Sequence, residues 1–504
     1  MERKEPKKIA RLQRVKRPRG RRRYGQNEDG EIGEQDETAS TDSGGIPGVL
    51  VIPGYHYDPN TKKYFKITPG WTPKVPEPEK PVVLAKPKKI NPLLLMNDFN
   101  CGAIRHNEYS RRLREGRIFE VNPKPSAIYE IVNPSSFSVP LNGCQFMEPS
   151  VDGKTIFSCW SSSNNGYQDE KLSRITIKVS YDPDIAEKAH RLEDSRTEEE
   201  NLENPCNKSG IYLACSDISS DLKGNSLVDA CVARVDKDVT CCLYVVAGTM
   251  LTEHGLRSRC SVKFEPLPEF CTRDYFNFQS SPIYNQKWAV DCSVYSCGWS
   301  GNKMRVSIGM GECARILDII AESSFVISSK KKNVISQQFS SDGNLLFMGL
   351  RAENAIQSDL RMPSKHVTAS LKGTRNTSYL RVLEHTHPNS LVTDTFAGEL
   401  KLWDLRRPDR ELREFKGHAN SHYRLPAFVD SNEQFLFAVG EDEVTRGWSL
   451  ATGDMLCEIP SPCPSPGRTD FPRVVYNDSW GGRVNNPALI IANGNSCRVH
   501  PLFH

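Results

Sequence analysis

The sequence has no run of 18 or more apolar residues, which excludes a transmembrane helix on length alone. Its first residues are charged and contain none of the apolar core that a secretory signal needs. We therefore expect a protein of the nucleus and cytoplasm with no membrane partner. With 504 residues and 38% hydrophobic content, the chain is long enough for one large repeat domain or for two or three ordinary domains.

Motifs that mark metal sites and catalytic centres are missing as well. The 16 cysteines include no C-x-x-C pair, and several stand in apolar text such as Cys242-Leu243-Tyr244, so we expect buried free thiols. The sequence contains no P-loop, no H-E-x-x-H, no dinucleotide-binding glycine pattern and no Ser-His-Asp signature. These absences predict a protein that is not an enzyme, with no catalytic residues, no metal and no cofactor.

Charge is distributed unevenly along the chain. Residues 1–24 hold 12 Lys/Arg and 2 acidic residues, whereas the rest of the chain holds 54 basic and 60 acidic residues. The segment 1–48 is first basic and then acidic, and it has too little apolar surface to fold, so we expect a disordered tail. Its basic tract fits a nuclear import signal, a nucleic-acid contact or a solvated tail without a partner.

Two short segments precede the main body. Residues 49–75 contain an aromatic hook at 53–66, in which two aromatic stretches flank Asp58-Pro59-Asn60-Thr61 and predict a hairpin. Residues 76–124 read as a Pro-rich linker followed by a short helical segment over 92–116. The apolar residues of both segments need a surface to cover them, either the main domain or a partner.

Residues 125–504 have the texture of short strands and turns, with a charged insertion near 183–208. Trp403 and Trp448 are 45 residues apart, and the text Ser358-Asp359-Leu360-Arg361 lies another 45 residues before Trp403-Asp404-Leu405-Arg406. This period is typical of one four-stranded blade of a WD40-type β-propeller. We predict an all-β propeller of seven blades, with six or eight as alternatives. Closing the ring removes exposed sheet edges.

One repeat carries the polar residues of a WD blade. Gly417-His418 precedes Asp442 by 24 residues, and Asp442 precedes Trp448 by six. In WD repeats such a His, Asp and Trp share a hydrogen-bond network that holds the blade together. We therefore predict a blade-stabilising role for His418, Asp442 and Trp448.

The two Asp-x-Arg sequences contain an arginine that a plain repeat does not require. One blade apart, Arg361 and Arg406 are expected to emerge on the same face of the ring. A guanidinium can make paired planar hydrogen bonds, and arginine is enriched at protein-binding hot spots. The pattern therefore predicts a protein-docking face, although the same text also occurs in repeats where it is purely structural.

Taken together, the tandem boxes, the aromatic hook and the helical segment resemble the WD-repeat substrate receptors of cullin-4 RING ubiquitin ligases, in particular the group of the fourth cullin-4-associated factor. The resemblance covers the chain from residue 49. It implies docking to the triple-propeller adaptor of the ligase, and through it to cullin-4 and a RING subunit, so that a client protein is presented for ubiquitination. The family pattern departs at Ser358, where a Trp is expected, and at Ala397, where a turn Asp is expected.

The resemblance also assigns contact residues. The expected adaptor-binding residues are Asp359, Arg361, Trp403, Asp404 and Arg406. A second contact is expected from the helical segment, through Leu93, Leu94, Leu95, Tyr109 and Leu113.

A second hypothesis is kept open. The alternative is a general WD-repeat scaffold of an RNA-processing or chromatin assembly, with bases stacked on the tyrosines of the hook and phosphates held by Arg21–Arg23. Under the ligase hypothesis we expect no nucleic-acid partner.

Overall fold

The computed structural model describes residues 55–58, 63–66, 91–119, 121–131, 141–163, 170–184, 209–216, 221–222, 226–235, 239–252, 255–267, 283–362, 367–461 and 471–502. The chain divides into two compact units, Met1–Val83 and Leu84–His504. The predicted disordered tail and, apart from its first two residues, the predicted insertion near 183–208 lie outside the described residues.

The first unit contains the hairpin that was expected within the aromatic hook. Strands β1 (Tyr55–Asp58) and β2 (Lys63–Lys66) pair in antiparallel register. Tyr57 lies opposite Tyr64 in this register, so the two aromatic stretches form one short ribbon.

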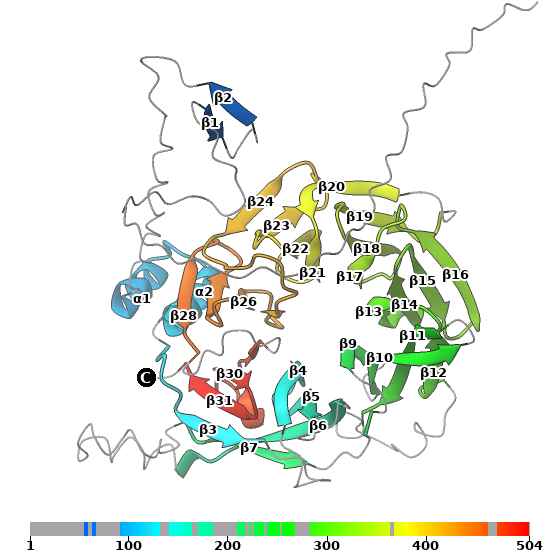
Figure 1. The fold of residues 1–504 in the computed structure, drawn as a ribbon. Coiled ribbons are helices and arrows are strands. Elements are labelled where there is room, and N and C mark those ends of the chain that lie inside the picture. Colours follow the sequence, from blue (N-terminus) through cyan, green and yellow to red (C-terminus); the bar gives the residue numbers. More distant parts are fainter. Residues whose placement is uncertain are drawn as a thin grey trace, which may run out of the picture. The chain divides into compact units, whose positions relative to one another are not determined.

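The second unit is a β-propeller of seven blades, as predicted (Figure 1). In the first three blades the strands are, from the channel outward, β4 (Leu141–Pro149), β5 (Thr155–Ser163), β6 (Glu170–Tyr181) and β7 (Ile211–Ser216); β9 (Ser226–Arg234), β10 (Thr240–Thr252), β11 (Gly255–Pro266) and β12 (Gln286–Val290); β13 (Val294–Ser300), β14 (Arg305–Met310), β15 (Cys313–Asp318) and β16 (Ser323–Ser328). A two-residue strand, β8 (Asp221–Leu222), also pairs with β6.

Blades four to six repeat this order without interruption. Their strands are β17 (Val334–Phe339), β18 (Leu345–Leu350), β19 (Asn354–Asp359) and β20 (Val367–Arg375); β21 (Thr377–Leu383), β22 (Ser390–Thr395), β23 (Leu400–Asp404) and β24 (Glu411–Phe415); β25 (Ala427–Val429), β26 (Phe435–Val439), β27 (Thr445–Ser449) and β28 (Met455–Ile459).

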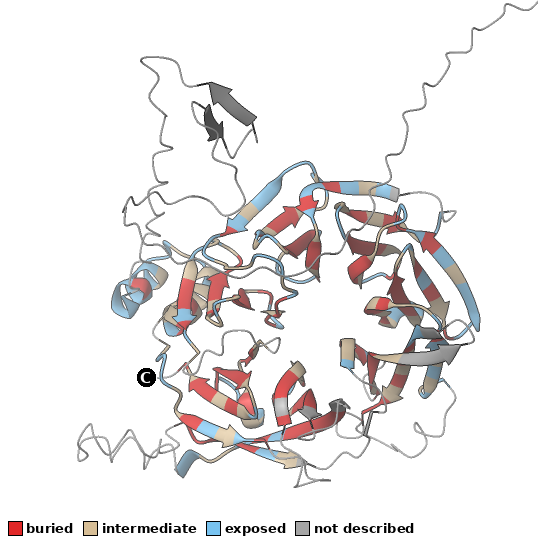
Figure 2. Cartoon of the chain, viewed as in Figure 1, coloured by how far each residue is buried: buried red, intermediate tan, exposed pale blue. Residues whose placement is uncertain are grey.

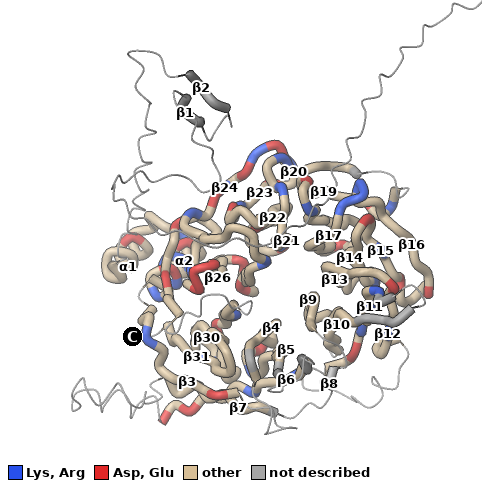
Figure 3. Tube along the Cα trace, viewed as in Figure 1, with Lys and Arg blue, Asp and Glu red and all other residues tan. Residues whose placement is uncertain are grey.

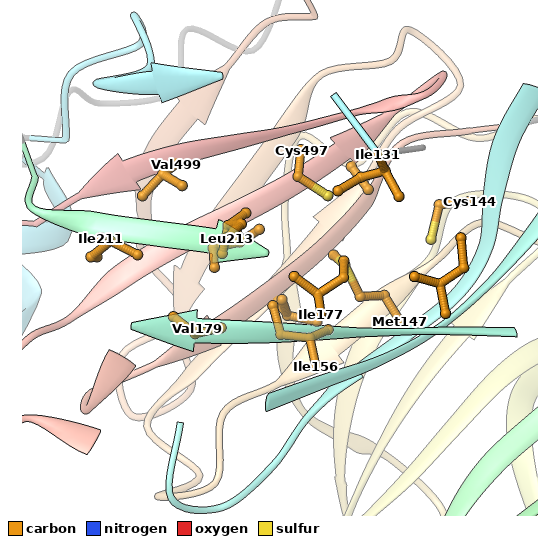
Figure 4. Packing of buried hydrophobic residues seen from close by; sticks show 14 of the residues in the cluster. Ile131, Cys144, Met147, Ile156, Ile177, Val179, Ile211, Leu213, Cys497 and Val499 are labelled. Atoms are coloured by element: carbon orange, nitrogen blue, oxygen red, sulfur yellow. The ribbon is translucent and has the colours of Figure 1, made fainter. Parts of the chain in front are cut away.

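The seventh blade closes the ring with strands from both ends of the unit. It combines β29 (Arg473–Asn477), β30 (Ala488–Asn493) and β31 (Ser496–Pro501) with β3 (Ala127–Glu130), which pairs with β31 as the outermost strand. Apolar side chains of the seventh blade, including Val499 and Cys497, pack against those of the first, such as Ile177 and Met147 (Figure 4). This packing joins the seventh blade to the first and closes the ring, so neither the first nor the last sheet is left uncovered.

Close packing between neighbouring blades depends on small residues at repeated positions. The hydroxyl of Ser296 donates to the Val334 carbonyl at 2.9 Å, and one blade later Ser336 donates to the Thr377 carbonyl at 2.8 Å. Gly349 lies opposite Ser336 across the strand pair, and a Cβ there would collide with the Ser336 hydroxyl and the Thr377 carbonyl. Glycine is therefore required for the backbones to approach this closely.

The 45-residue repeat of the sequence corresponds to one structural register. Ser358, Trp403 and Trp448 occupy the same place in successive blades, opposite the second residue of the neighbouring strand. Both tryptophans are fully buried in separate clusters between the sheets. Burying such large side chains is a main source of propeller stability, and Figure 2 shows the buried residues concentrated along the inner strands of the blades.

Two helices precede the first strand of this unit. Helix α1 (Pro92–Asn100) begins at Asn91, whose side chain accepts from the backbone N–H groups of Leu93 and Leu94, and has Pro92 in its first turn. Helix α2 (His106–Phe119) follows after a short turn, and Phe99 stacks on Tyr109 with ring centroids 4.8 Å apart. Among the described helices, none is long and apolar enough to cross a membrane.

The strand order gives the ring two distinct faces. In each complete blade, the turns from first to second strand and from third to fourth strand lie on one face, which includes Arg406 after β23 and which we call the Arg406 face. The turns from second to third strand and the links between blades lie on the opposite face, which includes Arg351 after β18 and which we call the Arg351 face.

Candidate docking face

Two aspartate–arginine pairs with the same geometry project from the Arg406 face. The Arg406 guanidinium bonds to both carboxylate oxygens of Asp404, with Nε–Oδ1 and Nη2–Oδ2 both 3.0 Å, and its backbone N–H also donates to Oδ1 at 3.0 Å. The Arg361–Asp359 pair makes the same three bonds, at 3.0, 2.6 and 2.9 Å. Each arginine is therefore held flat against its turn by two parallel hydrogen bonds.

Both guanidinium groups are nevertheless open to solvent. The side chains of Arg406 and Arg361 are 72% and 66% exposed, whereas those of Asp404 and Asp359 are 23% and 11% exposed. Within the described part of the chain, neither Nη1 atom has an acceptor. The carboxylates thus orient the arginines and leave donors free for a partner.

The arginines also keep the two carboxylates charged. The hydrogen bonds from Arg361 lower the pKa of Asp359 to about 2, and those from Arg406 lower the pKa of Asp404. Both pairs are therefore fully ionised at neutral pH.

The register of the strands shows which blades can form such a pair. Asp318, Asp359, Asp404 and Ser449 occupy equivalent positions at the end of the third strand in blades three to six. Of these four positions, only Asp359 and Asp404 are followed two residues later by arginine. Asp318 pairs instead with Arg305, at 2.9 Å. The tandem pairs therefore occur in blades four and five, where the sequence predicted them.

A hollow lies beside the Arg406 pair. It has a volume of about 390 Å³ and is lined by Asp404, Arg406, Arg407, Arg410, Glu411 and Leu412. Leu412 is 52% exposed at this site. Three arginines around an exposed leucine provide both the charge and the apolar surface that protein partners commonly engage.

In blade six, helix α2 covers the equivalent position. Ser449 stands where blades four and five have aspartate, and its hydroxyl donates to the Glu115 carboxylate of α2 at 2.6 Å. Glu115 also bonds to Arg111 within the helix. A carboxylate–arginine group is thus present in blade six as well, but the helix supplies it.

Further contacts fix α2 across blades six and seven. Arg114 donates to the Gln434 side chain at 3.0 Å and lies 3.9 Å from the Asp478 carboxylate. Ile118 is buried between the two blades among Phe435, Tyr476 and their neighbours. Because these contacts are made by turns of the Arg406 face, α2 and the two Asp–Arg pairs form one continuous arc over blades four to seven.

Helix α1 presents an apolar surface at the end of this arc. Leu93, Leu94 and Met96 are 77%, 63% and 52% exposed, whereas Leu95 between them is 4% exposed. Of the residues predicted as a second contact, Leu93 and Leu94 are thus accessible, and Leu95 is part of the core. Tyr109 and Leu113 are half-buried on α2, so their role is mainly to support the helical pair.

One predicted contact residue of the box is internal. Trp403 is 1% exposed, and its indole N–H donates to the Thr393 hydroxyl at 2.8 Å. It cannot present its ring to a partner without unfolding the blade. Its place in the expected contact set is therefore corrected to a supporting one: Trp403 is the residue before Asp404 on β23, and its burial in the core fixes the end of the strand that carries Asp404.

The structure gives His418, Asp442 and Trp448 different partners from those expected. His418 is fully buried, with Nε2 lying 3.4 Å from Asp394 Oδ2 and its ring edge-on to Trp448. Asp442 pairs instead with Arg446, at 2.6 and 3.0 Å, and the Trp448 indole donates to the Lys416 carbonyl. The three residues therefore do not form the single expected network: Trp448 and the His418 side chain are buried, whereas Asp442 is exposed and pairs with Arg446.

A second arginine-centred site lies across the channel. Arg424, in the link between blades five and six, donates through Nη1 to the carbonyls of Val228 at 3.2 Å and Tyr295 at 3.1 Å. Its Nη2 is 3.0 Å from Asp229. These acceptors belong to blades two and three, so Arg424 spans the mouth of the channel on the Arg351 face.

Below this strut is a hollow of about 290 Å³, bordered by the inner strands of blades one to six. Its charged lining residues are Glu148, Asp229, Arg381 and Arg424. Glu148 accepts from the Val232 N–H, and burial raises the pKa of its carboxyl group.

Sequence reasoning missed Glu115, Arg114 and Arg424. Ser449 at the expected aspartate position was a signal that blade six differs, but no sequence pattern points from there to a helix 334 residues earlier. Arg424 gives no signal at all, since its acceptors come from distant blades.

Comparison with known proteins agrees with the fold. The family model described as the DDB1- and CUL4-associated factor 4 beta-propeller domain matches residues 207–498. An uncharacterized WD repeat-containing protein of Caenorhabditis elegans is 35% identical, with 90% of each chain covered. DDB1- and CUL4-associated factor 4 of Bos taurus is 26% identical, covering 91% of this chain and 88% of the relative, and that of Homo sapiens is 24% identical, covering 91% and 89%. The chain belongs to the DDB1- and CUL4-associated factor 4 family of β-propeller proteins.

Proposed function

We propose that this protein is a non-catalytic receptor that docks on a DDB1-type adaptor of a CUL4 ubiquitin ligase and holds client proteins for ubiquitination. The observation that carries the proposal is the pair of identical Asp–Arg forks in adjacent blades, with exposed guanidinium groups. Relatives over nine-tenths of the chain are named as DDB1- and CUL4-associated factors, which supports the same partner.

The fork geometry suits docking because each guanidinium group is already oriented before the partner binds. Two hydrogen bonds already fix each guanidinium, so binding immobilises little additional side-chain freedom. The free Nη1 groups can then donate to carbonyl or carboxylate oxygens of the adaptor.

Helix α1 supports a second contact on the same face. Leu93 and Leu94 are exposed on a helix that the rest of the arc holds in place through α2. An apolar helix surface of this kind fits a groove on a partner, and binding would remove its two leucines from water.

The experiment is capture of the adaptor by the full chain carrying R361A and R406A together. Each replacement removes an oriented donor group, and we expect the double variant to lose about 100-fold or more in affinity, as at interface hot spots. Thermal stability should remain nearly unchanged because the two pairs are exposed ion pairs on turns.

The matched control is R315A/R351A, which removes two exposed arginines that lie away from the Arg406-face turns. Undiminished adaptor capture by R361A/R406A would contradict the proposal. A large loss of stability in that variant would instead assign the forks a purely structural role.

A further inference from the structure

Five cations gather on the Arg351 face, opposite the docking forks. Three belong to the link between β16 and β17, one to the turn after β18 and one to the end of β20: Lys330, Lys331, Lys332, Arg351 and Arg375. We call this set the Lys331 patch; lysine and arginine positions are blue in Figure 3.

Backbone hydrogen bonds hold the three loops of the Lys331 patch side by side. The Arg351 N–H donates to the Asn333 carbonyl at 3.0 Å, which joins the first loop to the second. The Asn376 N–H donates to the Glu353 carbonyl at 3.3 Å, and the Ala352 N–H donates to the Asn376 side chain at 2.5 Å, which joins the second to the third. The cations therefore occupy one continuous surface over blades three to five.

Within the described part of the chain, the five charges are not neutralised by ion pairs. In the described residues, none of these side chains has a hydrogen bond or an ion pair. Two carboxylates lie close by: Glu353 is in the same turn as Arg351, and Glu312 is in the turn between β14 and β15, where its carbonyl accepts from the Ser329 N–H at 3.2 Å. Three positive charges therefore remain in excess. Among the other acids of this face that the structure describes, Glu399 pairs with Lys401, Glu441 with Ser421 and Asp442 with Arg446.

Two lysines at the centre of the patch have a left-handed backbone conformation, which is unfavourable for lysine. The Lys332 N–H donates to the Ser329 carbonyl at 3.1 Å, which closes a turn with Lys330 and Lys331 in its middle. Their φ values are +56° and +60°, a left-handed conformation that favours Asn-Gly in turns of this kind. This conformation disfavours lysine relative to a residue suited to the turn. The backbone of the turn does not favour lysine at these two positions, so we attribute the two lysines to their charge.

We propose that the Lys331 patch binds an acidic segment, rich in aspartate, glutamate or phosphorylated residues, of the client protein. The inference rests on the proposed receptor function, in which the face opposite the adaptor is free for a client. Positive charge without internal partners attracts such a segment over a distance of about 10 Å and orients it on contact.

A peptide fits the Lys331 patch better than a nucleic acid. The loops 329–333, 351–353 and 375–376 contain no aromatic residue on which bases could stack. Glu312 and Glu353 interrupt the positive surface, which disfavours a continuous phosphate backbone and is tolerated by a peptide with spaced charges. The Lys331 patch is formed by turns and links on the surface of this face, so the ligand meets a surface and not a tunnel.

The test is binding of a labelled peptide with alternating glutamate and serine to the full chain, by fluorescence anisotropy at low and moderate salt. The variant K330N/K331G/R351Q removes three charges and gives the strained turn its preferred residues, so folding is retained. We expect its affinity for the peptide to fall about tenfold or more, with a weaker salt dependence. The control K178Q/K287Q/R315Q removes three exposed charges from the strands β6, β12 and β15 and should stay within about twofold of wild type.

Further measurements distinguish an acidic peptide ligand from the alternatives. A peptide with glutamine in place of glutamate should not bind, and adaptor capture by K330N/K331G/R351Q should equal that of wild type. Equal peptide binding by both triple variants, or no binding by wild type, would overturn the proposal. Tighter binding of single-stranded RNA, lost in K330N/K331G/R351Q, would also overturn it and assign the patch to nucleic acid. The two proposals fail independently: if R361A/R406A still captures the adaptor, the adaptor-docking proposal is wrong, and the peptide measurements still decide whether the Lys331 patch binds an acidic segment.

Discussion

The Ser449 hydroxyl donates a 2.6 Å hydrogen bond to the carboxylate of Glu115, which lies 334 residues earlier in the chain. Ser449 is the blade-six equivalent of Asp404 and Asp359. The serine leaves room for the carboxylate that α2 brings to this position, and the helix thereby becomes part of the docking face.

We predict that S449D will detach helix α2 more strongly than S449A. Removing the hydroxyl leaves Glu115 with one hydrogen-bonded partner fewer and costs about 1.5–3 kcal/mol, whereas an aspartate adds repulsion between two carboxylates. Hydrogen exchange of residues 106–119 measures the effect, since it reports local opening. Equal protection in both variants and the wild type would show that Glu115 does not anchor the helix.

Aspartates at the exposed leucines of α1 should weaken docking without unfolding the protein. L93D/L94D places charges on side chains that are 77% and 63% exposed, so the melting temperature should change little. Adaptor capture should fall about tenfold or more if these leucines enter an apolar groove. L95D is the contrasting variant, because it puts a charge in a buried position and should reduce protection of both helices.

The Arg424 strut should stabilise the ring. R424A removes two bonds to carbonyls and an ion pair with Asp229, and we expect a loss of about 1–3 kcal/mol in the free energy of unfolding. R381Q changes another arginine of the same channel, whose charge faces the buried Glu148 carboxyl but for which the structure gives no side-chain hydrogen bond among the described residues, and it should cost less than R424A. Denaturant unfolding of both variants checks the difference, and equal stabilities would reject a bracing role.

The inter-blade contact at Gly349 should not tolerate a methyl group. G349A would press a Cβ on Ser336 and the Thr377 carbonyl, and we expect a loss of about 1–3 kcal/mol from overpacking. G311A is a suitable comparison, since the nearest atom to its Cβ would be 3.8 Å away. Thermal unfolding of the two variants distinguishes a close approach from a general cost of replacing glycine.

The Asp359–Arg361 fork should titrate only in strong acid. Arg361 lowers the pKa of Asp359 to about 2, so the pair is intact above pH 4 and is lost progressively as the pH falls from 4 towards 2. Carbon NMR of the Asp359 carboxyl at pH 4 should show it almost fully ionised in wild type and up to about two-fifths protonated in R361A, where its pKa returns towards 3.8. A similar charge state in both proteins would mean that the fork does not form in solution.

The sequence by itself determined the propeller and the two forks. Both depend on residues close together in the chain: the 45-residue register of Ser358, Trp403 and Trp448 reports one blade per repeat, and an aspartate two residues before an arginine forms its fork within a single turn. Blades before residue 300 were visible only as strands, because their repeats lack these markers.

Only the tertiary structure decided which residues share the docking face and what lies opposite. The contact of Glu115 with Ser449, the strut from Arg424 to Val228 and the assembly of the Lys331 patch each join segments that no local pattern connects. The physical reason is ring closure: once β3 pairs with β31, turns far apart in sequence are brought to the same side, and their charges and hydrogen bonds become neighbours.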